Sequence, residues 1–305
     1  MFDSINQDIK NYFKSGNMID KIIIVNVLVF LAITLIKIFF LIFELGSFKS
    51  TFIGFFALHS NIIEDLLKPW VFITHMFVHE GLFHILFNML WLYLFGRIVG
   101  DLLGNKRILP LYILTGLGSA IVFILSMSFL YSGQDITAIG ASGAVLGLAV
   151  VAAALNPEMS IRLFLLGNVR LKYLVLGLVI LDLVFLSNGS NTGGRFGHLG
   201  GALTGGIYMF LLRNKQVDMT NPIINILDSL TNFYNSFFDD ADIKKNRKIK
   251  KSNPSRKKNG GRRSNIDKNL SHQEQLDLIL EKIKKSGYDS LTKEEKEFLF
   301  QASKK

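Results

Sequence analysis

The sequence predicts an all-α, polytopic membrane protein built as a bundle of six transmembrane helices. Half of its 305 residues are hydrophobic and 19% are charged, whereas a soluble domain carries about 25% charged residues. The mean hydropathy is positive, at +0.35, and the apolar residues gather in long runs. The net charge of +10 comes from one short segment. These features exclude a basic nucleic-acid-binding surface, which would spread over a folded face.

Six apolar segments are candidate membrane spans. A helix needs about 20 mostly apolar residues to cross about 30 Å of hydrocarbon. Several of the segments are short or interrupted by glycine, which is typical of helices buried inside a bundle. Together they form a domain of residues 21–213. The predicted spans are residues 21–43, 82–99, 108–130, 139–155, 171–186 and 196–212.

The basic residues of the loops predict the orientation in the membrane. Short cytoplasmic loops carry an excess of Lys and Arg. With a cytoplasmic N-terminus, six spans also return the C-terminus to the cytoplasm, and the overall composition favours a bacterial inner membrane. The inner loops then hold Arg97, Lys106, Arg107, Arg162, Arg170 and Lys172, and the outer loops hold Lys49, Lys68 and Arg195.

Two amphipathic segments flank the six spans. Residues 1–20 and 214–240 carry apolar side chains at intervals of three or four positions. This periodicity predicts helices that lie on the membrane surface. Short cytoplasmic helices packed on a core have the same pattern, so the sequence leaves both interpretations open.

The C-terminal part divides into a linker and a small helical unit. Residues 241–268 hold 12 Lys and Arg against 2 Asp and Glu, which accounts for the whole net charge. This composition cannot bury a core and predicts a disordered linker. Contact with anionic lipid is expected, because each basic residue near such a surface contributes about 1 kcal/mol. Residues 269–305 are predicted to form a helical hairpin with two capping boxes, Ser271 with Glu274 and Thr292 with Glu295.

Four polar residues inside the spans are candidate site residues. Polar groups in a bilayer cost free energy and commonly mark function. His84 and Asn88 lie on the second span, Ser142 begins the fourth and His198 begins the sixth. These three spans run in the same direction, from outside to inside. All four residues are therefore expected at similar depth, near the outer face.

The pairing of a serine with a histidine suggests nucleophilic catalysis. A serine hydroxyl attacks efficiently only with a base in hydrogen-bonding reach, and His198 is the base available to Ser142. The absence of Cys excludes a thiol nucleophile. Close approach of the two helices requires small residues at their contact. The sequence supplies Gly140, Gly143 and Gly147 on one helix and Gly201 and Gly205 on the other.

The second span offers hydrogen-bond donors for the same site. His84 and Asn88 are four residues apart, so both project from one helix face. An imidazole N–H and a carboxamide suit a developing oxyanion. Any one of the four polar residues alone would usually have a structural role. Four of them on three helices at one depth favour a catalytic site.

Other patterns do not predict a metal or cofactor. The run from His79 to His84 resembles a zinc-protease motif, but its second His lies five residues on instead of four. The segment around Ser142 is not a nucleophile elbow, because Ala144 replaces the last glycine and no strand precedes it. His75 and His79 have helical spacing, but no third ligand beyond Glu80 is evident. We expect them to order the loop.

At these residues the sequence resembles the rhomboid family of intramembrane serine proteases. The similarity covers residues 68–212 and rests on three motifs in the expected order. The motifs are His84-xxx-Asn88, Gly140-Ala141-Ser142-Gly143-Ala144 and His198-xx-Gly201-xxx-Gly205.

The resemblance implies a role for each matched residue. Ser142 and His198 would form a catalytic dyad. The oxyanion hole would include His84, Asn88 and the backbone of Ala141 and Ser142. Phe87 would line a substrate gate.

The sequence departs from the family pattern beside the catalytic histidine. Many relatives carry an aromatic residue four positions after the nucleophile, where this chain has Leu146. We therefore expect apolar packing to orient His198. A dyad lacks the third group that fixes the histidine tautomer. Asp182 is the carboxylate near the outer end of a span that could assist, with capping or water contact as the alternative.

The predicted function is a serine-type endopeptidase that cleaves transmembrane proteins without a cofactor. Two alternatives remain open. A catalytically silent rhomboid-like scaffold would bind client helices, although the four polar residues argue against it. A transporter would normally show repeated halves with broken helices, and no such repeat is evident in the sequence.

Overall fold

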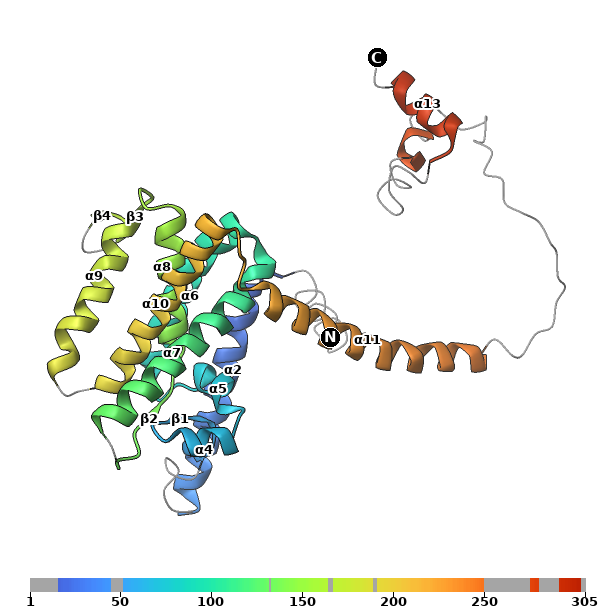
Figure 1. The fold of residues 1–305 in the computed structure, drawn as a ribbon. Helices are drawn as coiled ribbons and strands as arrows, with labels where there is room; N and C mark the ends of the chain where they lie inside the picture. Colours follow the sequence, from blue (N-terminus) through green and yellow to red (C-terminus); the bar gives the residue numbers. More distant parts are fainter. Residues whose placement is uncertain are drawn as a thin grey trace. The chain divides into compact units, whose positions relative to one another are not determined.

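The structure is a computed structural model that describes residues 16–44, 52–131, 133–163, 167–188, 191–249, 275–279 and 291–302. The chain divides into two compact units, Met1–Phe238 and Asp239–Lys305. The first unit contains a bundle of long helices (Figure 1). The surface helix predicted for residues 1–20 lies largely outside the described residues, since the description begins at residue 16.

Each of the six predicted spans contains a long helix, so the predicted class of polytopic helical membrane protein is confirmed. Among the described residues, three helices are long and apolar enough to cross a membrane by length and composition, namely α2, α6 and the helix over Asn105–Leu130. Helices α8 and α9 have 14 residues each. The helices are α2 (Met18–Ile42), α6 (Leu82–Leu103), α7 (Ile108–Leu130), α8 (Ser142–Leu155), α9 (Leu171–Val184) and α10 (Thr192–Lys215).

The starts of α8 and α10 differ from the predicted boundaries. Helix α8 begins at Ser142 instead of residue 139, because Gly140 has φ +118° and ends an extended segment. Helix α10 begins at Thr192, about one turn before residue 196. His198 therefore lies in the second turn of its helix, while Ser142 is the first residue of its own.

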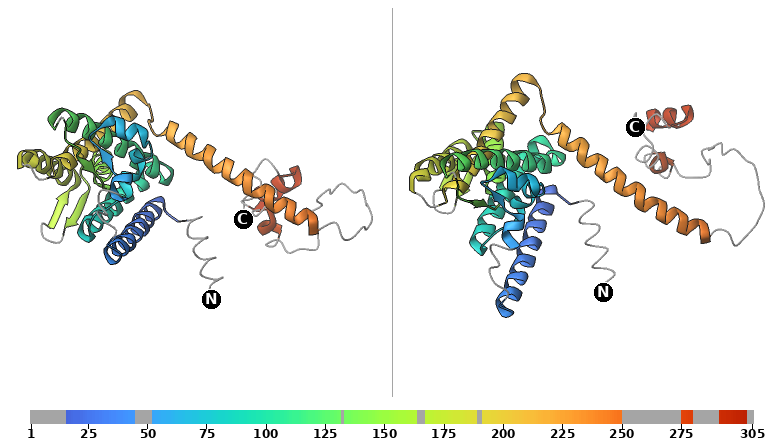
Figure 2. Two further views of the ribbon diagram at one scale, coloured as in Figure 1. Left: turned by 90° about the horizontal axis from the view of Figure 1, so that it is seen from below. Right: turned by 60° about the horizontal axis from the view of Figure 1, so that its bottom comes forward.

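The bundle is arranged around α8, which is buried along most of its length. Helix α10 packs against α8 and α7, and α2 and α9 lie at the outside (Figures 1 and 2). These two helices expose large apolar side chains, including Leu41 at 78% on α2 and Val184 at 59% on α9. Such exposure is unfavourable in water and is expected where the neighbour is lipid.

The connection between α2 and α6 folds over one end of the bundle. Strand β1 (Leu58–His59) pairs antiparallel with β2 (Thr137–Ala138), so that His59 lies opposite Thr137. The Ser60 hydroxyl donates to the Gln134 carbonyl oxygen at 2.8 Å. This ladder ties the connection to the loop that leads into α8. Its short helices are α3 (Gly54–Phe56), α4 (Ile62–Leu67), α5 (Val71–Thr74) and η2 (His75–Phe77).

A small hairpin joins α8 to α9 at the opposite end of the bundle. Strands β3 (Ser160–Leu163) and β4 (Gly167–Arg170) are antiparallel. Glu158 pairs with Arg170 at 3.0 Å and also with Lys172. The pKa of Glu158 is lowered by its hydrogen bond from Lys172 and by the charges of both basic residues. The sequence analysis predicted neither this hairpin nor the β1–β2 pair.

Helix α11 (Asn221–Ile249) is longer than the predicted surface helix. The segment just before α11 is tied to η3 (Asn105–Arg107), because Arg107 Nε donates to Asp218 Oδ2 at 2.7 Å. The predicted linker begins too early, since residues 241–249 are helical. Residues 250–268 of the predicted linker lie outside the described residues.

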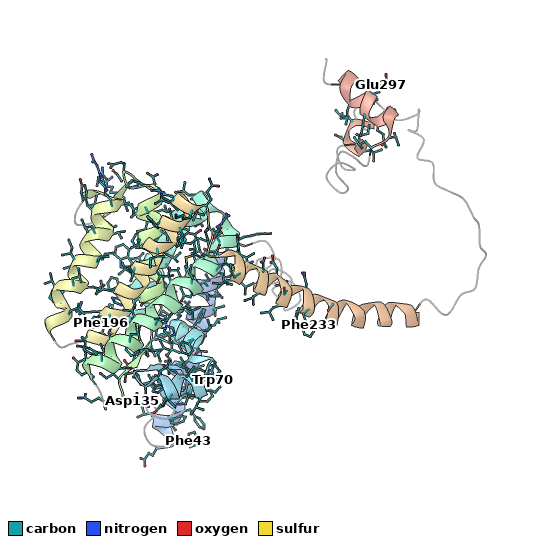
Figure 3. The ribbon with its side chains drawn as sticks, in the orientation of Figure 1. Phe43, Trp70, Asp135, Phe196, Phe233 and Glu297 are labelled. Atoms are coloured by element: carbon teal, nitrogen blue, oxygen red, sulfur yellow. The ribbon has the colours of Figure 1, made fainter. Side chains whose placement is uncertain are left out.

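The apolar side chains of α11 are exposed in the first unit. Phe233, labelled in Figure 3, is 70% exposed, and Ile226, Leu230 and Tyr234 are exposed as well. A helix packed on a cytoplasmic core would bury this stripe. The exposure favours the membrane-surface interpretation of the predicted segment 214–240.

The C-terminal unit confirms one of the two predicted capping boxes. The Thr292 N–H donates to Glu295 Oε2 at 2.7 Å, and the Glu295 N–H donates to Thr292 Oγ1 at 3.3 Å. These reciprocal bonds begin α13 (Lys293–Ala302). The other predicted box, Ser271 with Glu274, lies outside the described residues.

Candidate active site

The structure brings Ser142 and His198 into direct hydrogen-bonding contact. His198 Nε2 lies 2.7 Å from Ser142 Oγ. The two residues are 56 positions apart in the chain and belong to α8 and α10. Both side chains are partly exposed, so a reactant can reach them. The predicted meeting of these residues therefore occurs.

Glycines allow the two helices to approach so closely. A Cβ at Gly201 would lie 1.9 Å from the Gly143 carbonyl oxygen, and a Cβ at Gly205 would lie 2.4 Å from the Gly147 carbonyl oxygen. Real side chains do not tolerate such distances, so the backbones of α8 and α10 touch directly. The predicted packing role of these four glycines fits this geometry.

Gly140 has a different role from the one predicted. It lies before α8, with φ +118°, and does not take part in helix packing. Its N–H donates to the His75 carbonyl oxygen at 2.8 Å. A Cβ there would lie 2.7 Å from His84 Nε2 and 3.8 Å from Ser142 Oγ. Glycine is required at this position both for the backbone conformation and for the approach of His84.

His84 and Asn88 occupy the predicted face of α6, beside the serine. The contacts at Gly140 place the His84 ring next to the segment that carries Ser142. The Asn88 carboxamide is buried and donates through Nδ2 to the His84 carbonyl oxygen at 2.9 Å. One Nδ2 hydrogen satisfies this bond, and the amide has a second.

The Ala141 backbone, which is predicted to contribute to an oxyanion hole, contacts a histidine in this structure. Its N–H donates to His79 Nε2 at 3.3 Å. The Ser142 N–H begins α8, where the first N–H groups of a helix have no intrahelical acceptor. In this arrangement the Ala141 N–H already has an acceptor, and the oxyanion roles of Ala141 and Ser142 stay predictions.

His198 Nδ1 faces a carboxylate, whereas Leu146 had suggested orientation by apolar packing. His198 Nδ1 lies 3.0 Å from Asp182 Oδ2 and 3.1 Å from Oδ1. Asp182 is 9% exposed and is also 3.3 Å from Arg195 Nη1. Leu146 is buried within α8. The signal in the sequence was a lone carboxylate on an apolar helix, with a basic residue three positions before the histidine.

His75 and His79 order the loop before α6, as predicted. His75 Nδ1 donates to the Val71 carbonyl oxygen at 2.8 Å. Burial lowers the pKa of His75 to about 4. Burial, with a smaller effect of His84, lowers the pKa of His79 to about 4. Both rings are therefore neutral at pH 7, and His79 can accept from Ala141.

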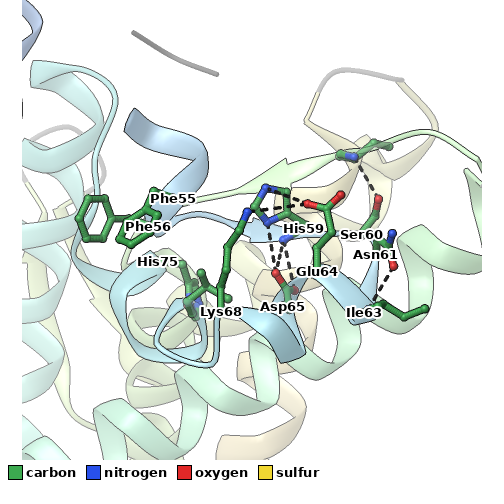
Figure 4. A network of polar contacts seen from close by, with 12 residues as sticks. Phe55, Phe56, His59, Ser60, Asn61, Ile63, Glu64, Asp65, Lys68 and His75 are labelled. Carbon is green, nitrogen blue, oxygen red and sulfur yellow. Dashed lines mark hydrogen bonds and ion pairs between the residues drawn. The ribbon is translucent and has the colours of Figure 1, made fainter. Parts of the chain in front are cut away.

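A polar network that the sequence did not predict stabilises the same end of the bundle (Figure 4). The His59 N–H donates to both oxygens of Asp65, at 3.0 and 3.2 Å, and His59 Nδ1 lies 3.2 Å from Asp65 Oδ1. Asp65 is fully buried, and this burial raises its pKa despite the hydrogen bonds. The network fixes β1 on α4.

One group within the described part of the chain has the composition of a metal site. Ligand atoms of His59, Glu64 and Asp135 lie within 4.8 Å of one another. Lys68 Nζ already lies 3.9 Å from Glu64 Oε2, so a cation is present beside this carboxylate. Asp135 is exposed. His59 and Glu64 of this group belong to the polar network of the loop.

Phe87 lies on the exposed side of α6. Its side chain is 55% exposed, close in sequence to Phe83, which is 72% exposed. Exposure of two large aromatic residues is compatible with contact to lipid or to a substrate helix. The predicted gate role stays a prediction.

Fold and site together define a polytopic helical membrane protein with a serine and a histidine in contact between two of its helices. Residues 67–215 match the model of the Rhomboid domain. Residues 262–305 match a family of unknown function (DUF6576). Residues 67–215 of the chain therefore form a domain of the rhomboid family.

Curated relatives from bacteria and plants are similar to more than half of this chain. Rhomboid protease GluP of Bacillus subtilis is 29% identical over 58% of this chain and 32% of its own length. Rhomboid protease AarA of Providencia stuartii is 29% identical over 52% of this chain and 62% of its own length. Rhomboid-like protein 11, chloroplastic, of Arabidopsis thaliana is 28% identical over 57% of each chain. The chain spans about half the length of the curated relatives it matches.

Proposed function

We propose that the protein is an intramembrane serine endopeptidase that cleaves transmembrane proteins. The observation that carries this proposal is the 2.7 Å contact between Ser142 Oγ and His198 Nε2 inside a rhomboid domain. Two relatives named as rhomboid proteases match 58% and 52% of this chain.

The reaction begins with attack of Ser142 Oγ on the scissile carbonyl carbon. His198 Nε2 takes the hydroxyl proton as the bond forms, and the carbonyl oxygen becomes an oxyanion. When the tetrahedral intermediate collapses, the peptide C–N bond breaks and His198 gives its proton to the leaving amine. Water then attacks the acyl-enzyme with the same base, which releases the carboxylate and restores the serine.

His84, Asn88 and the Ser142 N–H are the proposed donors to the oxyanion. His84 and Asn88 come from α6, which lies beside Ser142, and the third donor is the backbone N–H of Ser142 itself. A donor held in a dry site is worth more than the same donor in water, and removal of one typically costs about 100 to 1000-fold in rate.

The substrate class follows from the location of the pair between membrane helices. An intact substrate helix hides its peptide bonds in its own hydrogen bonds. A substrate must therefore unwind locally before Ser142 can attack. We propose a transmembrane protein whose segment near the outer face unwinds easily, with a small residue before the scissile bond.

Replacement of either member of the pair tests the proposed function. Purified Ser142→Ala and His198→Ala proteins are incubated with a model transmembrane substrate in proteoliposomes. We expect cleavage to fall by about 10⁴-fold or more, because loss of a nucleophile or its base removes covalent catalysis. Undiminished cleavage by either variant would refute the proposal.

A labelling experiment separates a protease from a silent scaffold. A fluorophosphonate reacts with an activated serine and forms a covalent phosphonyl adduct. We expect the wild type to be labelled and Ser142→Ala to remain unlabelled. A wild type that binds a client helix but resists the label would favour the scaffold.

We propose that the protein lies in a bacterial cytoplasmic membrane with both termini in the cytoplasm. The support is the positive charge of the loops at the β3–β4 end of the bundle, which includes Arg162, Arg170 and Lys172. Reporter fusions at the two termini test this orientation. Activity of an externally located reporter would contradict it.

A further inference from the structure

We propose that Asp182 is a positioning residue for His198 and that Arg195 holds Asp182 in place. The inference rests on the proposed function and extends it from a dyad to a triad supported by an arginine. Its basis is a continuous series of contacts across three helices, from α8 to α10 to α9.

The two ring nitrogens of His198 face a carboxylate on one side and the Ser142 hydroxyl on the other. Both oxygens of Asp182 approach His198 Nδ1, at 3.0 and 3.1 Å, while Nε2 faces Ser142 Oγ at 2.7 Å. The two ring nitrogens are thus assigned to two different partners. A carboxylate that only capped a helix or contacted water would not lie with both oxygens at this nitrogen.

The contact with Asp182 determines which tautomer of His198 is present. An ionised carboxylate can only accept hydrogen bonds, so Nδ1 must carry the proton. Nε2 of neutral His198 then has the free lone pair, which accepts from the Ser142 hydroxyl. This is the tautomer required of a general base, and without Asp182 the ring is free to adopt the other one.

Arg195 compensates for the burial of Asp182. Its Nη1 lies 3.3 Å from Asp182 Oδ1, and its guanidinium lies 5.1 Å above the Phe185 ring. Arg195 is in the first turn of α10, where the helix dipole disfavours a cation. It is three residues before His198, so both side chains extend from one face of α10 toward the same carboxylate.

Asp182 acts through the histidine and keeps its own charge. When Nε2 takes the proton from Ser142, the imidazolium becomes positive beside the Asp182 carboxylate, which stabilises it. The proton on Nδ1 stays there, and the proton on Nε2 passes to the leaving amine. Arg195 remains paired with Asp182 throughout.

The alternative is that Asp182 only fastens α9 to α10. In α9, Leu171 and Val175 are the other buried residues, so a structural ion pair would have value there. The two roles differ in their consequences. A fastener contributes to stability whichever partner is removed, whereas a positioning residue affects the chemical step more than the binding of substrate.

The deciding experiment compares Asp182→Asn with Arg195→Gln and with Glu158→Gln, which removes the ion pairs at the other end of α9. Each full-length variant is reconstituted in liposomes, and kcat, KM and thermal unfolding are measured. We expect Asp182→Asn to lower kcat by at least tenfold with KM unchanged, and more than Arg195→Gln does. In soluble triads the corresponding loss reaches about 10⁴-fold. Glu158→Gln should leave kcat unchanged.

A second measurement reads the tautomer directly in the wild type and needs no Asp182 or Arg195 variant. Nitrogen-15 NMR of histidine in the wild type reports the tautomer of His198, assigned by the loss of its signals in His198→Ala. We expect Nδ1 to be protonated and Nε2 to be unprotonated.

The outcomes separate this inference from the proposed function. Absence of cleavage by the wild type overturns both. Cleavage that requires Ser142, together with a kcat of Asp182→Asn within tenfold of wild type or with Nε2 protonated, overturns the triad alone. An equal loss of kcat in Asp182→Asn and Arg195→Gln, in proportion to lost stability, shows that the pair is only a fastener.

Discussion

At the scale of single residues, the site depends on glycines, because a side chain at these positions would collide with the backbone of the neighbouring helix. The Gly201 position faces the Gly143 carbonyl oxygen of α8, and the Gly206 position has no atom within 4 Å of an added Cβ. Both residues belong to α10. They therefore form a matched pair in which one substitution meets backbone and the other meets open space.

We predict opposite effects of the two glycine substitutions. Gly201→Ala forces α8 and α10 apart, and overpacking of this kind costs about 1 to 3 kcal/mol or more. Its melting temperature and its rate of cleavage should both fall. Gly206→Ala should be neutral or stabilising by up to about 1 kcal/mol, because alanine favours helix over glycine. Thermal unfolding in detergent checks both; an unchanged Gly201→Ala protein would contradict the contact.

Single residues also show where sequence reasoning succeeded and where it stopped. Ser142, His198, His84 and Asn88 could be predicted because polar groups in apolar helices are rare and their depth follows from topology. The Asp182 contact was left open because the rotation of α9 about its axis depends on packing, which a largely apolar helix does not encode. The Ala141 contact with His79 depends on a loop conformation that no periodicity predicts.

At the scale of elements, the loops on the site side are fixed by buried polar groups. Tyr112 donates through its hydroxyl to the Met76 carbonyl oxygen at 2.9 Å, and His75 accepts from Gly140 through its backbone. The helices could be predicted from apolar length. The ladder of β1 with β2 could not, because each strand has only two residues and forms where two distant loops meet.

The neutral histidines of this connection predict an acid-sensitive fold. The pKa values of His75 and His79 are about 4 in the folded protein, against about 6.5 for an unperturbed histidine. Between these values the unfolded chain binds more protons than the folded one. Stability is therefore complete above pH 6.5 and is lost as the pH falls toward 4.

Thermal unfolding across this pH range tests the prediction. Each unit of pKa difference corresponds to about 1.4 kcal/mol, so a loss of several kcal/mol is expected from the two rings together. His79→Gln should be less stable at pH 7.5 but should lose less stability on acidification. A melting temperature of the wild type that is constant from pH 7.5 to 4.5 would exclude this role for the two histidines.

At the scale of the whole molecule, the net charge and the catalytic groups belong to different units. The predicted site residues lie in Met1–Phe238, and the 12 basic residues of 241–268 lie in Asp239–Lys305. Residues 262–305 match their own family of unknown function. Helix α11 passes from one unit into the other, so a truncation must leave its first part in place.

We predict that a protein ending at residue 238 still cleaves substrate. The contacts of Ser142, His198, Asp182 and Arg195 are all within the first unit, as is the Arg107–Asp218 pair at the start of α11. The truncated protein should keep its kcat within about threefold, because none of these groups is removed. The basic segment is expected to contribute lipid affinity, with about 1 kcal/mol per Lys or Arg near an anionic surface. Cleavage is therefore compared in neutral and in anionic liposomes. Loss of cleavage in both by a truncated protein that unfolds at the wild-type temperature would show that the second unit takes part in catalysis.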